Sequence, residues 1–341
     1  MKVSFIMPQG VTDYYGESAF MLMHKRTKFK SIVDAYDDSV DIIFNTCFFD
    51  YNQSNLNLIF KKTYKDNRLI YEKKYPDKIY INYFWDIPFW RAKDSTVKRK
   101  YFIFKEPSWE ERYIAFLRSG NILLSSSDHT KNQVVDFYGI ESKVLYMYFP
   151  NIDIDQIKYD GKKKNQIICV GRIERFKRSD VLIKAMSLLE NPPELLLIGK
   201  GSERDACLKL ADKLGIKVRS PGWLDRVSTI REIKSSIMSV SPSIMEGNCG
   251  WCPCEAAWAG IPAVMADIPE TQEFFKNTGL YFKKDDPKSL AEQIRSVLNK
   301  TQAERDDLAR EQKEQISFYT VDEGIERLER FLEDVSEKYL R

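Results

Sequence analysis

Two cations stand close together after one predicted strand. The apolar run 166–170 predicts a buried strand, which is followed by Gly171-Arg172 and then by Lys177, just before a predicted helix. Fixed positive charge beside the exposed N–H groups of a helix N-terminus is a favourable site for a diphosphate. A solvated basic loop is the competing interpretation, because charged loops are common between strands and helices.

Two carboxylates flank a glycine-containing turn in a second candidate site. Glu246 follows a predicted strand, and Glu255 lies at the start of a predicted helix. Gly247 and Gly250 lie between them and remove side-chain bulk, so a sugar or phosphate can approach the backbone N–H groups closely. A loop carboxylate can accept hydrogen bonds from sugar hydroxyls, and one near a helix start can hold a ribose diol.

The elements that must position these residues alternate in type along the chain. Short apolar runs alternate with amphipathic segments of helix length, a pattern typical of βα units around a parallel sheet. We expect strands at 2–7, 41–46, 78–84, 121–125, 143–148, 166–170, 195–198, 217–219, 236–240 and 262–265, and helices at 16–27, 54–65, 108–117, 128–137, 179–189, 202–214 and 252–258.

A polar, turn-rich segment at 150–165 predicts a linker, so we expect an α/β chain with two domains, at 1–155 and 156–320. Residues 321–341 predict a terminal helix that packs back on the first domain. Its apolar residues fall on one stripe, and they are Val321, Ile325, Leu328, Phe331, Leu332 and Val335.

Composition excludes several classes of protein. The 341 residues carry 53 Lys and Arg against 50 Asp and Glu, which is not the excess expected of a nucleic-acid binder. There is no run of apolar residues long enough to span a membrane and no cleavable signal pattern, so we expect a cytoplasmic protein. The spacing of the six cysteines is unlike that of a secreted disulfide framework, so we expect reduced thiols.

Together these motifs resemble the carboxyl-terminal half of family 4 (group 1) glycosyltransferases. The resemblance rests on their order and strand context, in the segments Gly171-Arg172 with Lys177, Leu197-Ile198-Gly199-Lys200-Gly201, Pro242-Ser243, Glu246-Gly247, Glu255-Ala256 and Gly260-Ile261-Pro262-Ala263-Val264. The first half is similar more loosely, at Met7-Pro8-Gln9-Gly10, at 125–131 and at Pro150-Asn151-Ile152-Asp153.

The resemblance implies a GT-B fold, in which two Rossmann-like domains have parallel sheets that face each other across a cleft. It also implies a retaining, metal-independent glycosyltransferase without a cofactor. Such an enzyme transfers a sugar from a UDP- or GDP-sugar donor to a hydroxyl of a glycan, a lipid-linked acceptor or another small molecule. Peripheral contact with a membrane is part of this expectation, and a nucleic-acid partner is not.

The resemblance also implies roles for individual residues. Arg172 and Lys177 neutralise the leaving diphosphate, Glu246 contacts hydroxyls of the donor sugar, and Glu255 binds the ribose. At the remaining donor-binding positions the donor approaches the backbone closely or accepts hydrogen bonds from backbone N–H groups. These positions are Gly10, Gly171, Gly247, Asn248, Cys249, Gly250 and Trp251. Candidates for the acceptor side are Trp85, Asp86 and His129.

Three departures from the family pattern bear on these roles. Glu246 and Glu255 are nine residues apart where the family usually has eight, so the turn between them must bulge and reshape the sugar pocket. Lys177 is followed by Arg178 where the family usually has glycine. The first domain carries Trp85-Asp86 where many members have a histidine after a strand.

Other interpretations of the same residues stay open. Cys249, Cys252 and Cys254 could bind zinc or form a redox pair, although small thiols packed under a tight turn explain them as well. The basic cluster around His24 is either a solvated face or a contact for anionic lipid. For the whole chain, a nucleotide-sugar epimerase, a glycogen-type phosphorylase and a non-catalytic nucleotide-sugar binding protein remain alternatives.

Overall fold

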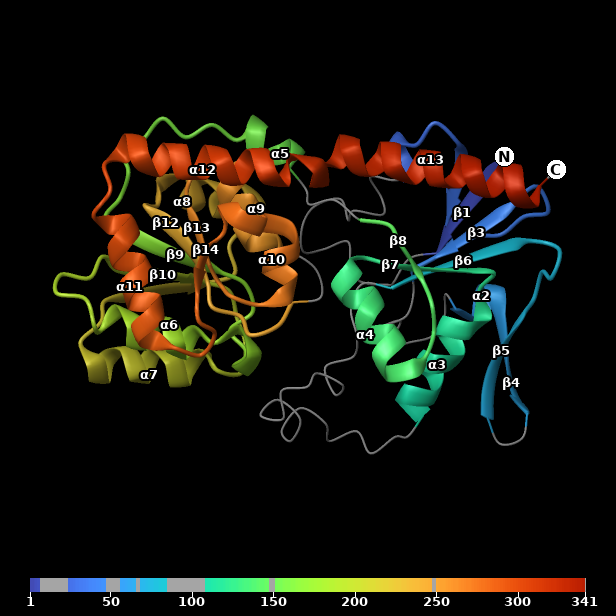
Figure 1. The fold of residues 1–341 in the computed structure, drawn as a ribbon, viewed down its shortest axis with the longest axis horizontal. Helices are drawn as coiled ribbons and strands as arrows, with labels where there is room; N and C mark the ends of the chain where they lie inside the picture. Colours follow the sequence, from blue (N-terminus) through green and yellow to red (C-terminus); the bar gives the residue numbers. More distant parts are fainter. Residues whose placement is uncertain are drawn as a thin grey trace. The chain divides into compact units, whose positions relative to one another are not determined.

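The computed structural model describes residues 1–6, 24–46, 56–65, 68–84, 108–146, 151–246 and 250–340. The chain divides into two compact units, Met1–Tyr148 with Val321–Arg341 and Phe149–Thr320 (Figure 1). The second unit therefore begins before residue 156, because helix α5 (Ile152–Gln156) belongs to it. Lys234 Nζ fixes the end of α5, since it donates to the carbonyl oxygens of Ile154 and Ile157 at 2.7 and 2.6 Å.

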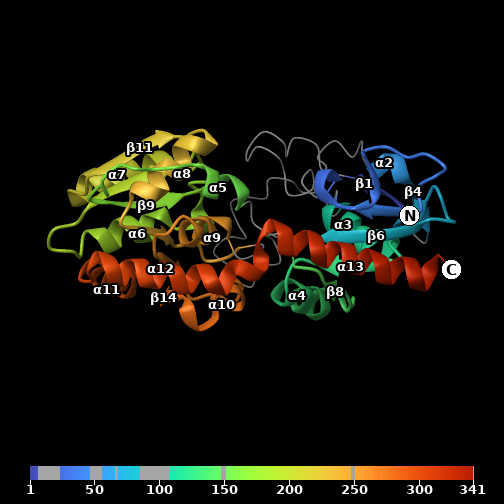
Figure 2. The same ribbon diagram turned by 90° about the horizontal axis from the view of Figure 1, so that it is seen from above.

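The second unit is built on a parallel sheet of six strands. Its strands are β9 (Gln166–Val170), β10 (Glu194–Ile198), β11 (Val218–Gly222), β12 (Met238–Ser241), β13 (Ala263–Ala266) and β14 (Leu280–Phe282). Helices pack around this sheet (Figure 2), namely α6 (Ser179–Met186), α7 (Arg204–Leu214), α8 (Arg226–Ser235), α9 (Trp251–Trp258), α10 (Pro269–Phe275), α11 (Pro287–Leu298) and α12 (Gln302–Ile316). Ile167, Leu195 and Val264 are fully buried, as expected for strands covered on both faces.

The direction of the chain through this sheet reverses beside β9. The strand order is β11-β10-β9-β12-β13-β14, so the chain moves outward from β9 to β11 and then returns to the other side of β9 at β12. This is the order of a Rossmann sheet, in which ligands bind at the carboxyl ends of the two strands that flank the reversal. The ends of β9 and β12 are therefore the expected ligand site of this unit.

The first unit has its own parallel sheet, in the order β2-β1-β3-β6-β7-β8. Its strands are β1 (Lys2–Ile6), β2 (Lys30–Val33), β3 (Ile42–Asn45), β6 (Ile79–Phe84), β7 (Ile122–Ser125) and β8 (Lys143–Val144), and its helices include α3 (Ser108–Ser119), α4 (Asp128–Tyr138) and α13 (Val321–Tyr339). Asn82 lies inside this unit and donates to the carbonyl oxygen of Phe116 at 2.7 Å, which ties α3 to β6.

The prediction of a helix at 54–65 is wrong over its second half. The structure has a single turn of helix, α2 (Leu56–Ile59), followed by the antiparallel strands β4 (Phe60–Lys65) and β5 (Arg68–Lys73). Burial in β5 alternates with a period of two, which is a strand pattern. The polar pair Asp66-Asn67 between two arms that contain β-formers is the hairpin signal that the prediction overlooked.

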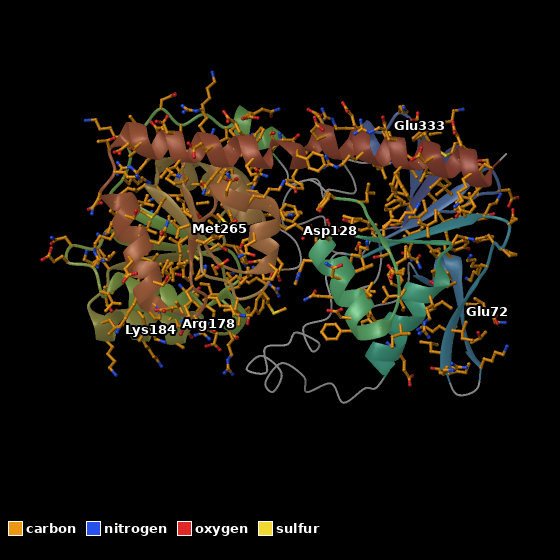
Figure 3. All side chains as sticks on the ribbon, in the orientation of Figure 1. Glu72, Asp128, Arg178, Lys184, Met265 and Glu333 are labelled. Atoms are coloured by element: carbon orange, nitrogen blue, oxygen red, sulfur yellow. The ribbon has the colours of Figure 1, made fainter. Side chains whose placement is uncertain are left out.

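Helix α13 packs on the first unit through its apolar stripe and through ion pairs. Of the six stripe residues, five are buried and Phe331 is half-buried. Arg26 pairs with Asp322 at 2.7 Å, and Lys28 pairs with Glu333, labelled in Figure 3, at 2.6 Å. Two members of the basic cluster around His24 are therefore engaged by carboxylates of this chain. No helix among the described residues combines the length and the apolar character needed to cross a membrane.

Glycine brings two loops of the second unit together at the carboxyl edge of its sheet. Gly199, directly after β10, has a φ of 143°, and an added Cβ would lie 1.8 Å from the carbonyl oxygen of Gly171 after β9. Both the backbone conformation and the space exclude a side chain. Gly199 therefore allows the segment after β10 to support the loop that carries Arg172.

We expect Gly199→Ala to lower the free energy of unfolding by about 3 kcal/mol, because the Cβ displaces backbone and the φ is strained. Gly215→Ala is the matched control, since Gly215 has a φ of 69° with nothing within 4 Å of an added Cβ and should cost only about 1 kcal/mol. Thermal and denaturant unfolding of both variants measure the difference. If both variants lost the same free energy of unfolding, the close approach of Gly199 to Gly171 would not add to the cost of a side chain.

Candidate functional site

The loop after β9 holds both predicted cations over one aromatic ring. Arg172 Cζ lies 5.3 Å and Lys177 Nζ lies 5.5 Å from the ring centroid of Phe176. Phe176 is buried in a 3-10 turn that spans Arg175–Lys177, so its ring is a fixed support for both side chains. Helix α6 begins shortly afterwards at Ser179, two residues after Lys177, and its first N–H groups have no partner within the helix.

Lys177 forms an ion pair with Glu246. Its Nζ lies 2.6 and 2.8 Å from the two carboxylate oxygens, and the two side chains are 24% and 12% exposed. Lys177 follows β9 and Glu246 follows β12, so the pair lies at the point where the strand order reverses. An ammonium group has three N–H donors, and an arriving anion can use the third or replace the carboxylate.

The backbone of Glu246 is held by a second acidic residue. Its N–H donates to Glu270 Oε1 at 3.1 Å, and Glu270 follows Pro269 in the first turn of α10. Burial raises the pKa of Glu270 to about 7, and the neighbouring charge of Glu246 acts in the same direction. Hydrogen bonds from the N–H groups of Glu270 and Glu246 oppose this rise, as does the charge of Lys284.

Glu255 is buried and paired with a residue that the sequence did not single out. Its Oε1 lies 2.5 Å from an Nη atom of Arg226, and only 1% of the Glu255 side chain is exposed. Arg226 begins α8, directly after its N-cap Asp225, and Glu255 lies in α9. A buried carboxylate needs compensating charge, and Arg226 supplies such charge to Glu255.

Cys252 and Cys169 are protonated thiols that pack at the end of β9. Cys252 Sγ donates to the carbonyl oxygen of Val170 at 2.9 Å, which ties the start of α9 to the end of β9. Burial raises the pKa of Cys252, and it raises that of Cys169 to about 12, so neither is a thiolate near neutral pH. Within the described ranges no group of three or more His, Cys, Asp or Glu is arranged to hold a metal ion.

Several predicted site residues lie outside the described residues, namely Gly10, Trp85, Asp86, Gly247, Asn248 and Cys249. Of the others, Gly171 has a φ of 139°, and Gly250, with a φ of 70°, precedes Trp251 at the start of α9. An added Cβ on Gly250 would lie 3.3 Å from the side chain of Glu246, so the absence of a side chain at this position gives Glu246 the space that it occupies. His129 is half-buried in the first turn of α4, in the first unit.

Sequence reasoning missed three residues that shape this site, namely Phe176, Arg226 and Glu270. Each carried a weak signal, since Phe176 lies between the two predicted cations and Arg226 follows a good N-cap residue, Asp225. Glu270 follows a proline at a helix start, where a carboxylate is common. None of these sequence signals predicts which part of the chain the side chain of Phe176, Arg226 or Glu270 contacts.

One protein-family model matches part of this chain. Residues 152–315, just under half of the chain, match the model of the family described as Glycosyl transferases group 1. This match confirms the predicted resemblance to group 1 over these residues. The search among curated protein sequences found no match.

Solved structures are similar over both units at low sequence identity. Sucrose-phosphate synthase from Thermosynechococcus elongatus has a TM-score of 0.73 at 12% identity, and the alignment covers 99% of this chain and 100% of that one. HepE from Anabaena, solved in complex with UDP and glucose, has a TM-score of 0.71 at 13% identity, with 98% and 100% covered. TarM from S. aureus has a TM-score of 0.64 at 15% identity, with 92% and 58% covered. The predicted α/β GT-B fold with two parallel-sheet domains is confirmed.

Glu270 should make the stability of the protein depend on pH. Because its pKa rises from 4.5 to about 7 on folding, the folded state holds a proton that the unfolded state loses as the pH rises through this interval. Stability should therefore fall with rising pH between these values, by up to about 3 kcal/mol. Glu270→Gln should remove this part of the pH dependence and raise the thermal midpoint at pH 8.

Thermal unfolding of the full chain at several values of pH from 5 to 8 measures this effect. Glu292→Gln, which removes an exposed carboxylate in α11, is the control and should keep the pH dependence of the unchanged protein. An unchanged pH dependence in Glu270→Gln would contradict the raised pKa.

Proposed function

We propose that this protein is a retaining glycosyltransferase that transfers a sugar from a UDP- or GDP-sugar to an acceptor hydroxyl. The observation that carries the proposal is the placement of Arg172, Lys177 and Glu246 at the reversal of the strand order in a group 1 glycosyl transferase domain. Cations, a helix N-terminus and a carboxylate meet at the edge of the sheet where such folds bind nucleotides.

In this proposal the donor replaces the internal ion pair. The diphosphate accepts hydrogen bonds from Lys177 and Arg172, and Glu246 is thereby released to accept hydrogen bonds from donor-sugar hydroxyls. Glu255 holds the ribose diol, and Arg226 keeps that carboxylate charged and oriented. The 2.6 Å pair supports the proposal, because an ammonium group that binds a carboxylate oxygen at the end of β12 is suited to bind a phosphate oxygen there as well.

The transfer itself needs no nucleophile from the protein. The acceptor oxygen forms its bond to the anomeric carbon on the face from which the diphosphate leaves, and its proton passes to an oxygen of the leaving phosphate. Negative charge grows on that phosphate during the reaction, and fixed cations aimed at growing charge are a large source of rate enhancement. The proposal gives this role to Arg172 and Lys177, whose charged groups both lie near the ring of Phe176.

The remaining expectations belong to the same proposal. We propose that the reaction needs no metal or cofactor, so that EDTA leaves it unchanged. The acceptor class is a glycan, a lipid-linked compound or a small molecule, and contact with a membrane surface stays a prediction, as does a cytoplasmic location. Because HepE was solved with UDP-glucose, UDP-sugars are the first donors to test.

One observation favours a second candidate, a non-catalytic protein that binds nucleotide sugars. Glu246 and Glu255 are nine residues apart, and in the structure each carboxylate already pairs with a cation of this chain. Such a protein binds the donor but releases no nucleotide diphosphate. A nucleotide-sugar epimerase, by contrast, changes the sugar without an acceptor, so analysis of products without acceptor separates that activity from transfer.

The first experiment is a panel of UDP-, GDP- and ADP-sugars, with and without EDTA, with thermal shift and released nucleotide diphosphate as readouts. With the preferred donor, Arg172→Ala and Lys177→Ala should each lower turnover on the order of a hundredfold. Lys184→Ala is the control, because Lys184 pairs with Asp180 within α6 and should leave turnover unchanged.

Full turnover in folded Arg172→Ala and Lys177→Ala would overturn the assignment of these cations. Stabilisation by a donor with no diphosphate released, across glycan and lipid-linked acceptors, would favour the binding protein instead.

A further inference from the structure

Exposed apolar side chains of the first unit gather at the hairpin β4–β5. Among the described residues of this unit that precede α13, the large apolar side chains that are exposed are Leu58, Tyr64 and Ile70. Tyr64 is 73% exposed and lies near the turn of the hairpin, and Leu58 lies just before β4. A single exposed apolar residue needs no explanation, but a group of them on one hairpin is a candidate interaction surface.

The same segment carries a local excess of positive charge. Residues 58–74 hold six of the 53 Lys and Arg but only two of the 50 Asp and Glu, so the net charge of this segment alone exceeds the +3 of the whole chain. Its cations are Lys61, Lys62, Lys65, Arg68, Lys73 and Lys74. Positive charge is therefore concentrated on the hairpin, and the rest of the chain is close to neutral.

The outer face of the hairpin brings both kinds of side chain together. Leu69 and Tyr71 are buried in the core of the unit, and side chains alternate between the two faces of a strand, so Ile70 lies on the outer face. The register of β4 with β5 places Ile70 diagonally between Lys61 and Lys65 on that face. An apolar group flanked by two ammonium groups is thus presented to solvent.

The outward lysines have no carboxylate partner within the described part of the chain. Neither Lys61 nor Lys65 forms an ion pair there, whereas Lys2 and Lys28 of the same unit each pair with a carboxylate. Glu72 is exposed on the same face, opposite Lys61 in the ladder, but the two side chains form no ion pair. Both ammonium groups are therefore available to an anion from outside the chain.

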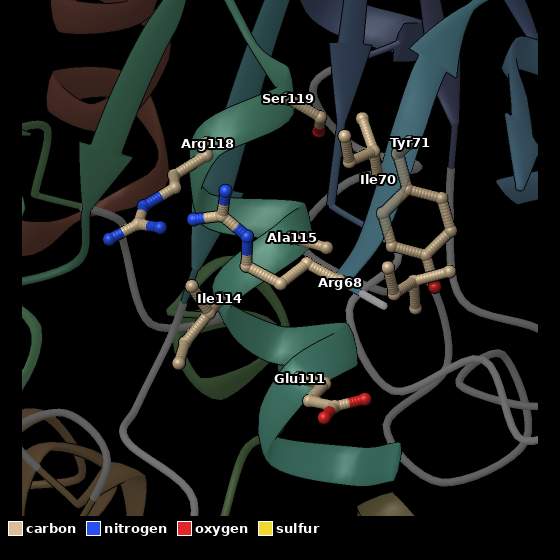
Figure 4. Close-up of a pocket in the computed structure, with 9 residues that line it drawn as sticks. Arg68, Ile70, Tyr71, Glu111, Ile114, Ala115, Arg118 and Ser119 are labelled. Carbon is tan, nitrogen blue, oxygen red and sulfur yellow. The ribbon is translucent and has the colours of Figure 1, made fainter. Parts of the chain in front are cut away.

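An apolar groove continues this surface between β5 and α3 (Figure 4). Its volume is about 470 Å³, and Ile70 and Ile114 are among the residues that line it. Arg68 and Arg118 line the same groove, and Glu111 lies two helical turns from Arg118 along α3. Cations thus border apolar surface here as well, an arrangement that suits a ligand with an apolar chain and an anionic head group.

Lysines on an exposed hairpin also have a protective use, because they prevent strand pairing between chains. That use does not call for exposed apolar side chains among the lysines, since such side chains favour association. Cations mixed with Tyr64 and Ile70 instead match an anionic lipid surface. On such a surface apolar groups enter the boundary between head groups and acyl chains, while cations are attracted to the negative head groups.

We propose that the hairpin β4–β5, with the groove beside it, is the surface through which this protein docks on an anionic lipid bilayer. Lys61 and Lys65 meet the head groups, and Tyr64 and Ile70 enter the boundary with the acyl chains. The proposal rests on the proposed function, in which membrane contact is an expectation, and it assigns that contact to the hairpin rather than to the cluster around His24. Vesicle binding requires neither donor nor turnover, so a failure to bind would not count against sugar transfer.

Co-sedimentation of the full chain with vesicles tests this surface. Vesicles of phosphatidylcholine mixed with phosphatidylglycerol should bind the protein, pure phosphatidylcholine should not, and added salt should weaken binding. Lys61→Gln with Lys65→Gln should weaken binding about thirtyfold, because each basic residue near such a surface contributes about fivefold. Tyr64→Thr with Ile70→Thr should weaken it about fivefold, because less apolar surface is buried.

Lys209→Gln with Lys213→Gln is the matched control. Both lysines are exposed on α7 of the second unit and form no ion pair with the described residues, so this variant removes the same charge elsewhere and should keep full binding. All substituted side chains of the hairpin are exposed, so these variants should fold, and circular dichroism and the thermal midpoint check this.

Several results would overturn the proposal. They are a protein that binds neither kind of vesicle or binds both equally, folded hairpin variants that bind as well as the unchanged protein, and a control variant that loses as much binding as the hairpin lysine variant. Binding to soluble polyphosphate without binding to vesicles would overturn the lipid assignment as well.

Discussion

Strand β9 is the constraint on which the second unit depends, because it lies in the centre of the sheet and is covered by helices on its faces. Ile167 and Ile168 are fully buried, and burial decreases toward Val170, so a residue that must meet solvent or a ligand has to follow the carboxyl end of the strand. The same holds for β12, its neighbour on the other side. Arg172, Lys177 and Glu246 follow these two strands, and the reversal of strand order brings them to one place.

Much of the second unit could be predicted from the sequence because its signals are local. Strand β9 is apolar from Ile167 to Val170, and the residues after β9 and β12 have the types and order of a known family. The partners of these residues could not be predicted in the same way. The ion pair of Lys177 with Glu246 spans 69 residues of sequence, and that of Arg226 with Glu255 spans 29, so both depend on the assembled sheet.

The errors of the prediction lie in both units and have identifiable physical causes. Strands β2 and β14, one in each unit, are edge strands that are short and only partly buried, so neither has the apolar run that reveals a central strand. Segment 54–65 has apolar residues at helical spacing at its start, but strand pairing determines its second half. For Gly10, Trp85 and Asp86 the sequence prediction stands alone.

Helix α13 has a consequence for how the chain reaches its folded state. The first unit consists of two stretches of sequence with the whole of the second unit between them. During synthesis the second unit can therefore fold as soon as its last helix leaves the ribosome. The surface that Leu328 and Leu332 cover stays exposed to solvent until α13 has been synthesised. The first unit is thus the later to mature, and in the interval its uncovered apolar surface is a natural target for chaperones.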